Sequence, residues 1–512
     1  MIYDFTPDEQ ARLSPYVTNT DRSIFGLRNL PEAVKAALFA RYSRTNKDLR
    51  RVLLDEFLPV LHRAESAKQS FDTAGADAFH DRVINEYGDD SVAELGGAHI
   101  AVEGVSQLAA LALCDNRIGM SPLVKSTRYV DFGKKINGRY QYHLPAMEPE
   151  EEIQATAAMD GLFDAYVALL PKVTTYLEQV NPRRPEIDEK PYKRAIKARA
   201  LDALRGLLPM GTATNMGLYG NGRAFDHLLA KLGASDHKEH MLLSMAICSE
   251  LQQLIPSLLK KQEYRSKQRI YLKDINTSMH KYTDDHNYQF TKDQCLLIES
   301  HGDVSELAAN ILYPHTNIDV DMIRRHIDAG TFLQGVTAEQ IFRDYIGKRP
   351  TRHVRPGRAL EKVRYTFDLV TDIGCHRDLQ RHRMTEQSRQ QLTCNLGHSV
   401  PELVQEAGLG TQYQQSMLNV WTAHSHLHPL LGEKAEYLVP MGFRIHWQMT
   451  LNLREAYHLI ELRTQPNGHQ SYRAIAQQMY HQIKAVHPWA TDGMTFVDLN
   501  DYELGRLSEN VL

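Results

Sequence analysis

Residues Arg205-Gly-Leu-Leu-Pro209 are followed, after a short gap, by Asn221-Gly-Arg223-Ala-Phe-Asp-His227. The same arrangement returns as Glu436-Tyr-Leu-Val-Pro440 and Asn452-Leu-Arg454-Glu-Ala-Tyr-His458. In both places Asn follows the Pro by 12 residues and His follows it by 18. Self-similarity at a fixed spacing indicates a duplicated fold, and it makes each half of the chain a control for the other.

Working outward from these stretches, the repetition covers most of the chain. Ser91-Val-Ala-Glu94-Leu corresponds in order and spacing to Arg358-Ala-Leu-Glu361-Lys. We therefore predict two repeats of single-domain length, repeat one at residues 30–255 and repeat two at residues 300–490. A polar connector at residues 256–299 joins them, with an N-terminal extension at residues 1–29 and a C-terminal tail at residues 491–512.

Local patterns favour a mixed α+β class for each repeat, a sheet flanked by helices. Apolar residues recur at helical spacing in 48–57, 224–232, 455–463 and 474–483. Residues 363–370 alternate and are rich in β-branched and aromatic side chains, which is typical of a strand with one buried face.

Composition is that of an ordinary globular protein, with 512 residues, 42% hydrophobic and 24% charged. No apolar run approaches the ~20 residues of a membrane span. The start of the sequence lacks the basic and apolar regions of a signal peptide. The five cysteines form no Cys-x-x-Cys pair, so we expect the protein to be located in a reducing cytoplasm. A net charge of −4 argues against nucleic acid as a partner.

One segment differs from this average. From Lys348 to Gln390 the sequence has eleven Lys and Arg residues and five acidic residues. Such an excess suits an anionic ligand, although a solvated basic surface is the alternative interpretation. The segment contains Arg377-Asp-Leu-Gln-Arg381-His382-Arg383, whose guanidinium groups can bind planar acceptors such as phosphate, carboxylate or the carbonyl edge of a flavin or pyrimidine.

The order of these features resembles the flavin-dependent thymidylate synthases, the ThyX family, duplicated in tandem. That family carries Arg-His-Arg, then Ser-x-Asn-Glu-x-Ser-x-Arg-Tyr, then an Arg four residues before a Pro, Asn-x-Arg and a late Leu-Arg. The matching residues here are Glu361, Tyr365-Thr-Phe367, Arg381-His382-Arg383, Pro440, Asn452-Leu-Arg454 and Leu462-Arg463.

Each repeat keeps a different part of this pattern. Repeat two keeps Arg381-His382-Arg383 and Arg463 but has Glu436 in place of the Arg before Pro440. Repeat one keeps Ser126-Thr-Arg128-Tyr129 and Arg205, yet Asn116-Arg117 stands in place of His-Arg and Leu232 in place of the late Arg. Because the family builds each nucleotide site from two subunits, the resemblance predicts one composite site per chain.

The resemblance also implies roles for these residues. Nucleotide binding falls to Ser126, Arg128, Arg205, Arg381 and Arg463, with Arg381 polarising a pyrimidine carbonyl as the catalytic residue. Flavin binding falls to His382, Arg383, Asn221, Arg223, His227, Asn452, Arg454 and His458. The cofactor would be FAD, and no metal is expected. Asn221 and Asn452 have an alternative interpretation as N-caps of the helices that follow them.

The implied reaction is the reductive methylation of dUMP to dTMP, with methylenetetrahydrofolate and NADPH as co-substrates. Two chains would form a homodimer equivalent to the family's tetramer. Two departures leave alternatives open. The acid near the pyrimidine is missing from both repeats, and Val124 or Lys125 occupies its place in repeat one. The His after the early Glu is Leu95 in repeat one and Lys362 in repeat two. The protein would then be a catalytically reduced FAD- or nucleotide-binding protein, or a flavoenzyme acting on another pyrimidine nucleotide.

Overall fold

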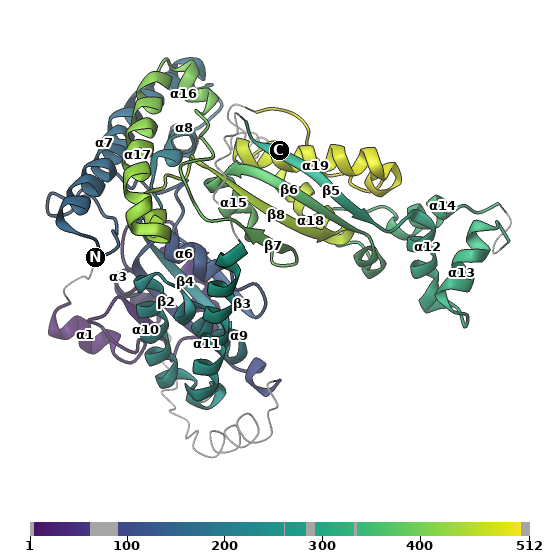
Figure 1. The fold of residues 1–512 in the computed structure, drawn as a ribbon, viewed down its shortest axis with the longest axis horizontal. Coiled ribbons are helices and arrows are strands. Elements are labelled where there is room, and N and C mark those ends of the chain that lie inside the picture. Colours follow the sequence, from purple (N-terminus) through teal and green to yellow (C-terminus); the bar gives the residue numbers. More distant parts are fainter. Residues whose placement is uncertain (1–4, 62–90, 261, 283–291, 332–334, 503–512) are drawn as a thin grey trace. The chain divides into compact units, whose positions relative to one another are not determined.

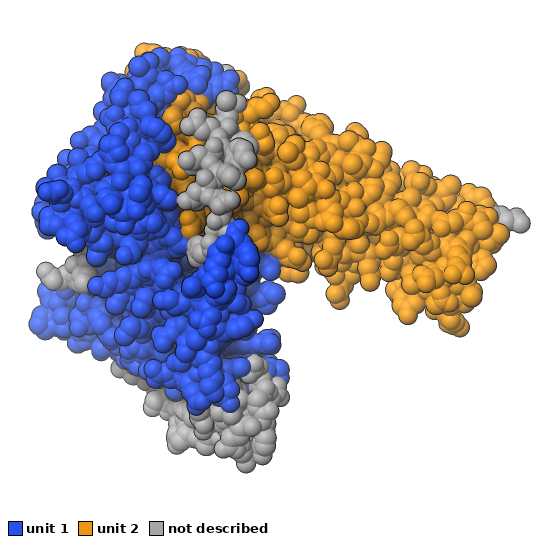
Figure 2. Space-filling view, viewed as in Figure 1, with its two compact units in different colours: residues 1–173, 201–287, 402–440 blue, residues 174–200, 288–401, 441–512 orange. Residues whose placement is uncertain are grey.

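The fold is taken from a computed structural model that describes residues 5–61, 91–260, 262–282, 292–331 and 335–502. It divides into two compact units, which Figure 2 colours blue and orange. Unit 1 contains residues 1–173, 201–287 and 402–440, and unit 2 contains residues 174–200, 288–401 and 441–512. Each unit is described by itself.

Unit 1 is built on a four-stranded antiparallel sheet (Figure 1). The strands run in the order β1-β2-β4-β3, with bounds Ile24–Leu27, Gly97–Ser106, Ala213–Asn221 and Met120–Val124. Helices α9 (Gly222–Ala234) and α10 (Lys238–Leu254) share a core with side chains from all four strands. A second core contains side chains of α1 (Pro7–Leu13), α2 (Glu32–Tyr42) and α3 (Leu49–Val52). Helices α4 (Leu58–Leu61) and α6 (Gln107–Cys114) complete this part of the unit.

Two long helices lie beside each other in unit 1 (Figure 1). They are α7 (Pro149–Val180) from the first repeat and α17 (Gly410–Leu431) from the second. Ala155 and Met159 of α7 share a buried cluster with Leu427 of α17. The remaining helices that begin in the unit 1 segments are α11 (Gln262–Met279) and α16 (Glu402–Glu406). Helix α8 (Glu189–Leu204) crosses the boundary at residue 200.

Unit 2 repeats the sheet. Its antiparallel strands run in the order β5-β6-β8-β7, with bounds Gln294–His301, Arg364–Asp372, Arg444–Asn452 and Glu386–Arg389. Helix α19 (Gln470–Val486) packs on β5 and β6 (Figure 1). The other helices are α12 (Val304–Leu312), α13 (Val320–Asp328), α14 (Ala338–Ile346), α15 (Ile373–Leu379) and α18 (Leu453–Arg463).

The two sheets agree in register as well as in order. Asn221 pairs with Gly97 at the end of β4, and Asn452 pairs with Arg364 at the end of β8. Each Asn then begins the next helix. The structure therefore confirms the predicted class, two tandem α+β repeats.

The compact units, however, do not follow the repeats. Pro209 and Pro440 form an antiparallel bridge, and Met210 N–H donates to Val439 O at 2.9 Å. Gly211 N–H donates to Tyr437 O at 2.7 Å. These bonds place residues 402–440 of the second repeat in unit 1. The repeat boundaries themselves stay a prediction.

Within the described residues, no helix combines the length and the apolar character that crossing a bilayer requires.

The burial of side chains on the sheet of unit 2 can be tested by substitution. Phe367 on β6 is fully buried, so we expect Phe367→Ala to lower the free energy of unfolding by about 3–5 kcal/mol. Ser388→Ala on the exposed part of β7 should change it by less than about 0.5 kcal/mol. Urea unfolding followed by tryptophan fluorescence reports on this, since Trp447 lies buried on the adjacent strand β8. Equal effects of the two variants would contradict the assignment.

Candidate functional site

The Arg-His-Arg stretch follows the end of α15. The helix ends at Leu379, and His382 N–H donates to Leu379 O at 3.0 Å. Thr385 Oγ1 donates to His382 O at 2.6 Å and holds the turn from the other side. As a result His382 is 4% exposed, whereas Arg381 and Arg383 are exposed. The spacing of Arg377 and Arg381 predicts that they share one face of a helix, and this prediction is wrong because the helix ends before Arg381.

His382 is held between two charged side chains of α18. Arg463 Nε donates to His382 Nε2 at 2.8 Å, and His382 Nδ1 lies 2.9 Å from Glu455 Oε1. A guanidinium has donors only, so His382 Nε2 must be the acceptor. The proton of the neutral ring therefore sits on Nδ1 and is donated to the Glu455 carboxylate. The neighbouring side chains thus select one tautomer.

The electrostatics agree with a neutral ring. Burial, together with the Arg463 charge, holds the pKa of His382 well below its usual range. Burial raises the pKa of Glu455 and lowers the pKa of His458. The site is therefore dry enough that each charge placed in it needs a partner.

His458 completes the cluster. Its ring centroid lies 5.4 Å from that of His382, and His382, Glu455 and His458 each offer one ligand atom within 4.8 Å of the others. Three such groups can hold a metal ion. However, the charges of Arg355, Arg454 and Arg463 all favour the ionised form of Glu455 against its burial. This positive surrounding opposes a cation and favours an anionic group.

Arg463 also makes other contacts with the protein. Its Nη2 donates to Asp378 O at 2.7 Å, and its guanidinium lies 5.1 Å from the centroid of the Tyr472 ring. In this structure Arg463 orients His382, and its predicted contact with a nucleotide stays a prediction.

The Asn-x-Arg stretches behave alike in the two repeats. Asn221 accepts from Ala224 N at 2.8 Å and caps α9, and Asn452 accepts from Glu455 N at 2.9 Å and caps α18. Both side chains therefore have the capping role that the alternative interpretation predicted. Their role toward a flavin stays a prediction.

The arginines of these stretches pair with the early glutamates. Arg223 Nη1 lies 2.7 Å from Glu94 Oε1, and Arg454 Nη1 lies 3.0 Å from Glu361 Oε1. Arg454 Nε also donates to Pro356 O at 2.9 Å. This shared ion pair supports the correspondence of Glu94 and Glu361 that the sequence predicted.

Repeat one lacks the histidine cluster. Asn116, at the place of His382, donates through Nδ2 to the backbone oxygen of Ala224 at 2.8 Å. Ala224 stands where Glu455 stands in repeat two, and buried Leu232 stands where Arg463 stands. His227, the counterpart of His458, is exposed, and its Nδ1 lies 3.3 Å from Gln268 Nε2. The chemistry at this position is confined to repeat two.

The predicted phosphate-binding residues lie in unit 1. Arg128 forms two hydrogen bonds with Asp202, from Nε at 2.8 Å and from Nη2 at 3.0 Å, and these fix the plane of its guanidinium. Arg128 N–H donates to Ser126 Oγ at 3.2 Å. Arg205 is buried, in the short turn that precedes Pro209. Burial lowers the pKa of the neighbouring Lys125 to about 8.

The two halves of the predicted composite site thus lie in different units. Within unit 2 the structure brings together His382, His458 and Arg463, and adds Glu455, which sequence reasoning missed. Its signal was present, because Glu455 and His458 are three residues apart and lie on one face of a helix.

Comparison with known proteins gives the family. The model described as "Thymidylate synthase complementing protein" matches residues 33–257 and 297–489. The chain belongs to this family. The resemblance to the flavin-dependent thymidylate synthases is confirmed at this level, with both repeats matched.

Curated relatives extend over the whole chain. A "UPF0159 protein" of Chlamydia muridarum is 36% identical and covers 99% of this chain and 98% of the relative. A "UPF0159 protein" of Thermoplasma acidophilum is 33% identical and covers 93% of this chain and 98% of the relative. The similarity to these relatives therefore extends over nearly the whole chain, across both repeats.

Among solved structures, a UMP/dUMP methylase PolB of Streptomyces cacaoi, bound with 5-Br dUMP, is similar at 15% identity. It covers 43% of this chain and 98% of its own, with a TM-score of 0.32. We draw no functional argument from this likeness.

The Arg463 contact can be tested by removing it. In Arg463→Ala the His382 ring loses both a cation and a donor at Nε2, so its pKa should rise. The pKa is followed by NMR of ¹⁵N-histidine-labelled protein, with His382→Asn to assign the signal. Arg383→Ala, which removes an exposed charge from the next residue, is the control. An unchanged His382 pKa in Arg463→Ala would contradict the proposed hydrogen bond.

Proposed function

We propose that this protein is a thymidylate synthase-like enzyme that methylates a pyrimidine nucleotide, with dUMP as the expected substrate and dTMP as the product. The observation that carries the proposal is the family match over both repeats, residues 33–257 and 297–489. The complementary residues of the two repeats support a single composite site per chain.

The nucleotide would bind through both repeats. Arg128 and Arg205 would hold its phosphate, since guanidinium groups bind phosphate in a bidentate way, and the Ser126 hydroxyl would assist. Arg128 suits this role because Asp202 already orients its guanidinium. Arg381, which is exposed beyond the end of α15, would donate to a pyrimidine carbonyl and stabilise the negative charge that develops on the ring.

We propose FAD as the cofactor. The site fits an anionic group, because Arg355, Arg454 and Arg463 surround a cluster with one carboxylate. His382, Arg383, Arg454 and His458 would hold it together with Asn452, and Asn221, Arg223 and His227 are the repeat-one candidates. When bound, the flavin supplies the hydride chemistry, and the protein supplies position and electrostatics.

The fixed tautomer of His382 has a consequence for this role. With Arg463 on Nε2 and Glu455 on Nδ1, the ring is rigid and uncharged. A neutral ring adds no positive charge to a pocket already rich in arginine. His382 would therefore orient its neighbours without taking up a proton at neutral pH.

NADPH and methylenetetrahydrofolate would be the co-substrates, and a homodimer would be the active assembly. One observation favours a second candidate, a flavoenzyme acting on another pyrimidine nucleotide. Val124, a buried apolar residue, or the neighbouring Lys125 stands where the family's acid is expected near the pyrimidine. A changed side chain at that place can change which pyrimidine is accepted.

Flavin binding is the first test. The purified chain should be yellow, or should become yellow on addition of FAD and show a flavin absorbance spectrum. Arg383→Ala should weaken FAD binding by roughly 10-fold or more, the loss expected for one charged hydrogen bond. Its control is Arg117→Ala, the repeat-one counterpart. A chain that takes up no FAD would refute the proposal.

Nucleotide binding tests the composite site. A spectral titration with dUMP should give one nucleotide per chain, and Arg381→Ala and Arg205→Lys should each weaken binding by roughly 10-fold or more. Lysine at position 205 keeps the charge of a buried residue and removes its planar fork. Asp115→Asn, at the counterpart of Arg381, should have no effect.

Loss of dUMP binding in only one of the two arginine variants would contradict the two-repeat site. If UMP or another pyrimidine nucleotide changes the spectrum and dUMP does not, the second candidate replaces the first.

A further inference from the structure

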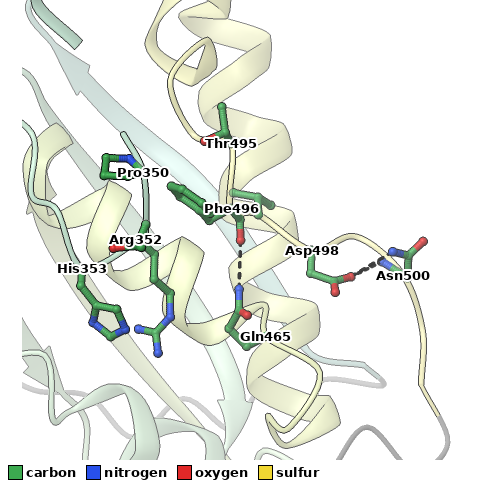
Figure 3. A pocket seen from close by; sticks show the side chains of 10 residues that line it. Pro350, Arg352, His353, Gln465, Thr495, Phe496, Asp498 and Asn500 are labelled. Atoms are coloured by element: carbon green, nitrogen blue, oxygen red, sulfur yellow. Dashed lines mark hydrogen bonds between the residues drawn. The ribbon is translucent and has the colours of Figure 1, made fainter. Parts of the chain in front are cut away.

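A cavity lies in unit 2, and none of the residues that line it belongs to the histidine cluster. It has a volume of about 520 Å³ and is lined by residues 350–353 on one side and 495–498 with Asn500 on the other (Figure 3). Gln465, just beyond the end of α18, also lines it. The volume is within the range of roughly 300–1,000 Å³ that small-molecule sites occupy.

Both walls of the cavity are anchored to α18 and the turn after it. The first wall, residues 350–353, comes directly after Arg349 in the sequence. The Arg349 guanidinium forms a buried, bidentate ion pair with Glu461. Arg349 Nε also donates to Val354 O at 3.0 Å. These contacts hold residues 350–353 in place.

The second wall is fixed by side-chain bonds to its backbone. Gln465 Nε2 donates to Phe496 O at 3.0 Å (Figure 3), and Arg473 Nη2 donates to Asn500 O at 2.7 Å. Asp498 N–H donates to Thr464 Oγ1 at 3.1 Å. The cavity is therefore preformed, so a ligand would not have to order its walls.

The charged side chains that line the cavity are Arg352 and Asp498, together with His353, which can ionise. Glu461 is paired with Arg349, and Asp498 lies 3.9 Å from Arg473 and accepts from Tyr502 Oη at 2.8 Å. In the part of the chain that the structure describes, no ion pair joins an acid to Arg352 or His353. Arg352 acts on Glu461 only at longer range. Two cationic or ionisable side chains are therefore left to face a ligand.

The cavity also offers an aromatic surface. Phe496 is half-buried in the second wall, and Figure 3 shows its side chain directed toward the first wall and Pro350. The guanidinium beside the Phe496 ring is that of Arg349, whose Cζ lies 5.4 Å from the ring centroid. Arg352 lines the same cavity, so a planar anion could stack on the Phe496 ring and pair with Arg352.

We propose that this cavity binds an oxyanion, a phosphate or carboxylate group, attached to a planar ring. Arg352 pairs with the oxyanion, His353 assists, and Phe496 stacks on the ring. The site is separate from the histidine cluster and does not depend on the function proposed for that cluster.

Calorimetric titration of the full chain tests the site. The probes are 5′-AMP, which carries a phosphate, folate, which carries carboxylates, and orthophosphate, which has no ring. Arg352→Gln should weaken the binding of whichever ring-bearing probe binds by roughly 10-fold or more, which corresponds to about 1.4 kcal/mol. Phe496→Leu should also weaken the binding of that probe. Binding of 5′-AMP assigns the oxyanion as phosphate, and binding of folate assigns it as carboxylate.

Lys348→Gln is the matched control, because it removes one exposed charge from the same segment outside the cavity. It should change affinity by less than about twofold, below the roughly 0.4 kcal/mol that such a factor represents. Arg383→Ala, at the histidine cluster, should also leave binding unchanged.

Three outcomes would overturn the proposal. In the first, neither ring-bearing probe binds. In the second, Lys348→Gln or Arg383→Ala weakens binding as much as Arg352→Gln does. In the third, orthophosphate binds as tightly as the ring-bearing probes and Phe496→Leu has no effect.

Discussion

The organisation of the chain depends on one backbone contact, the antiparallel pairing of Pro209 with Pro440. Proline has no N–H, so the hydrogen bonds come from the residues that follow Pro209: Met210 donates to Val439 O and Gly211 to Tyr437 O. Gly211 is required there, because a Cβ would lie 2.5 Å from His143 O. The contact ties a segment of the second repeat into unit 1, and the compact units consequently cross the repeats.

Around this contact the two copies have kept their scaffold and diverged in their chemistry. The shared elements are the strand order, the Asn cap, which satisfies the start of a helix, and an Arg–Glu ion pair at the surface. The unshared elements are side chains that touch one another only in repeat two. His382, Glu455 and Arg463 form one unit, and repeat one replaces all three positions with Asn116, Ala224 and Leu232. Replacement of all three avoids a buried charge without its partner.

Local patterns predicted the elements well, because periodicity and capping act over a few residues. The strand predicted at 363–370 is β6, and the helix predicted at 455–463 lies within α18. The site was harder. The predicted contact of Arg463 with a nucleotide stays a prediction, while its hydrogen bond with His382 and that of Glu455 were not predicted. Both depend on a contact across more than 70 residues, between the turn after α15 and the face of α18.

By itself, therefore, the sequence determined the duplication, the α+β class, the family and the inequality of the two copies, since all of these are carried by residue identity and spacing. Only the tertiary structure decided the tautomer of His382, the inclusion of residues 402–440 of repeat two in unit 1 and the cavity at Arg352. The physical reason is the same in each case. A hydrogen bond or a cavity wall depends on which distant groups meet, and spacing along the chain does not contain that information.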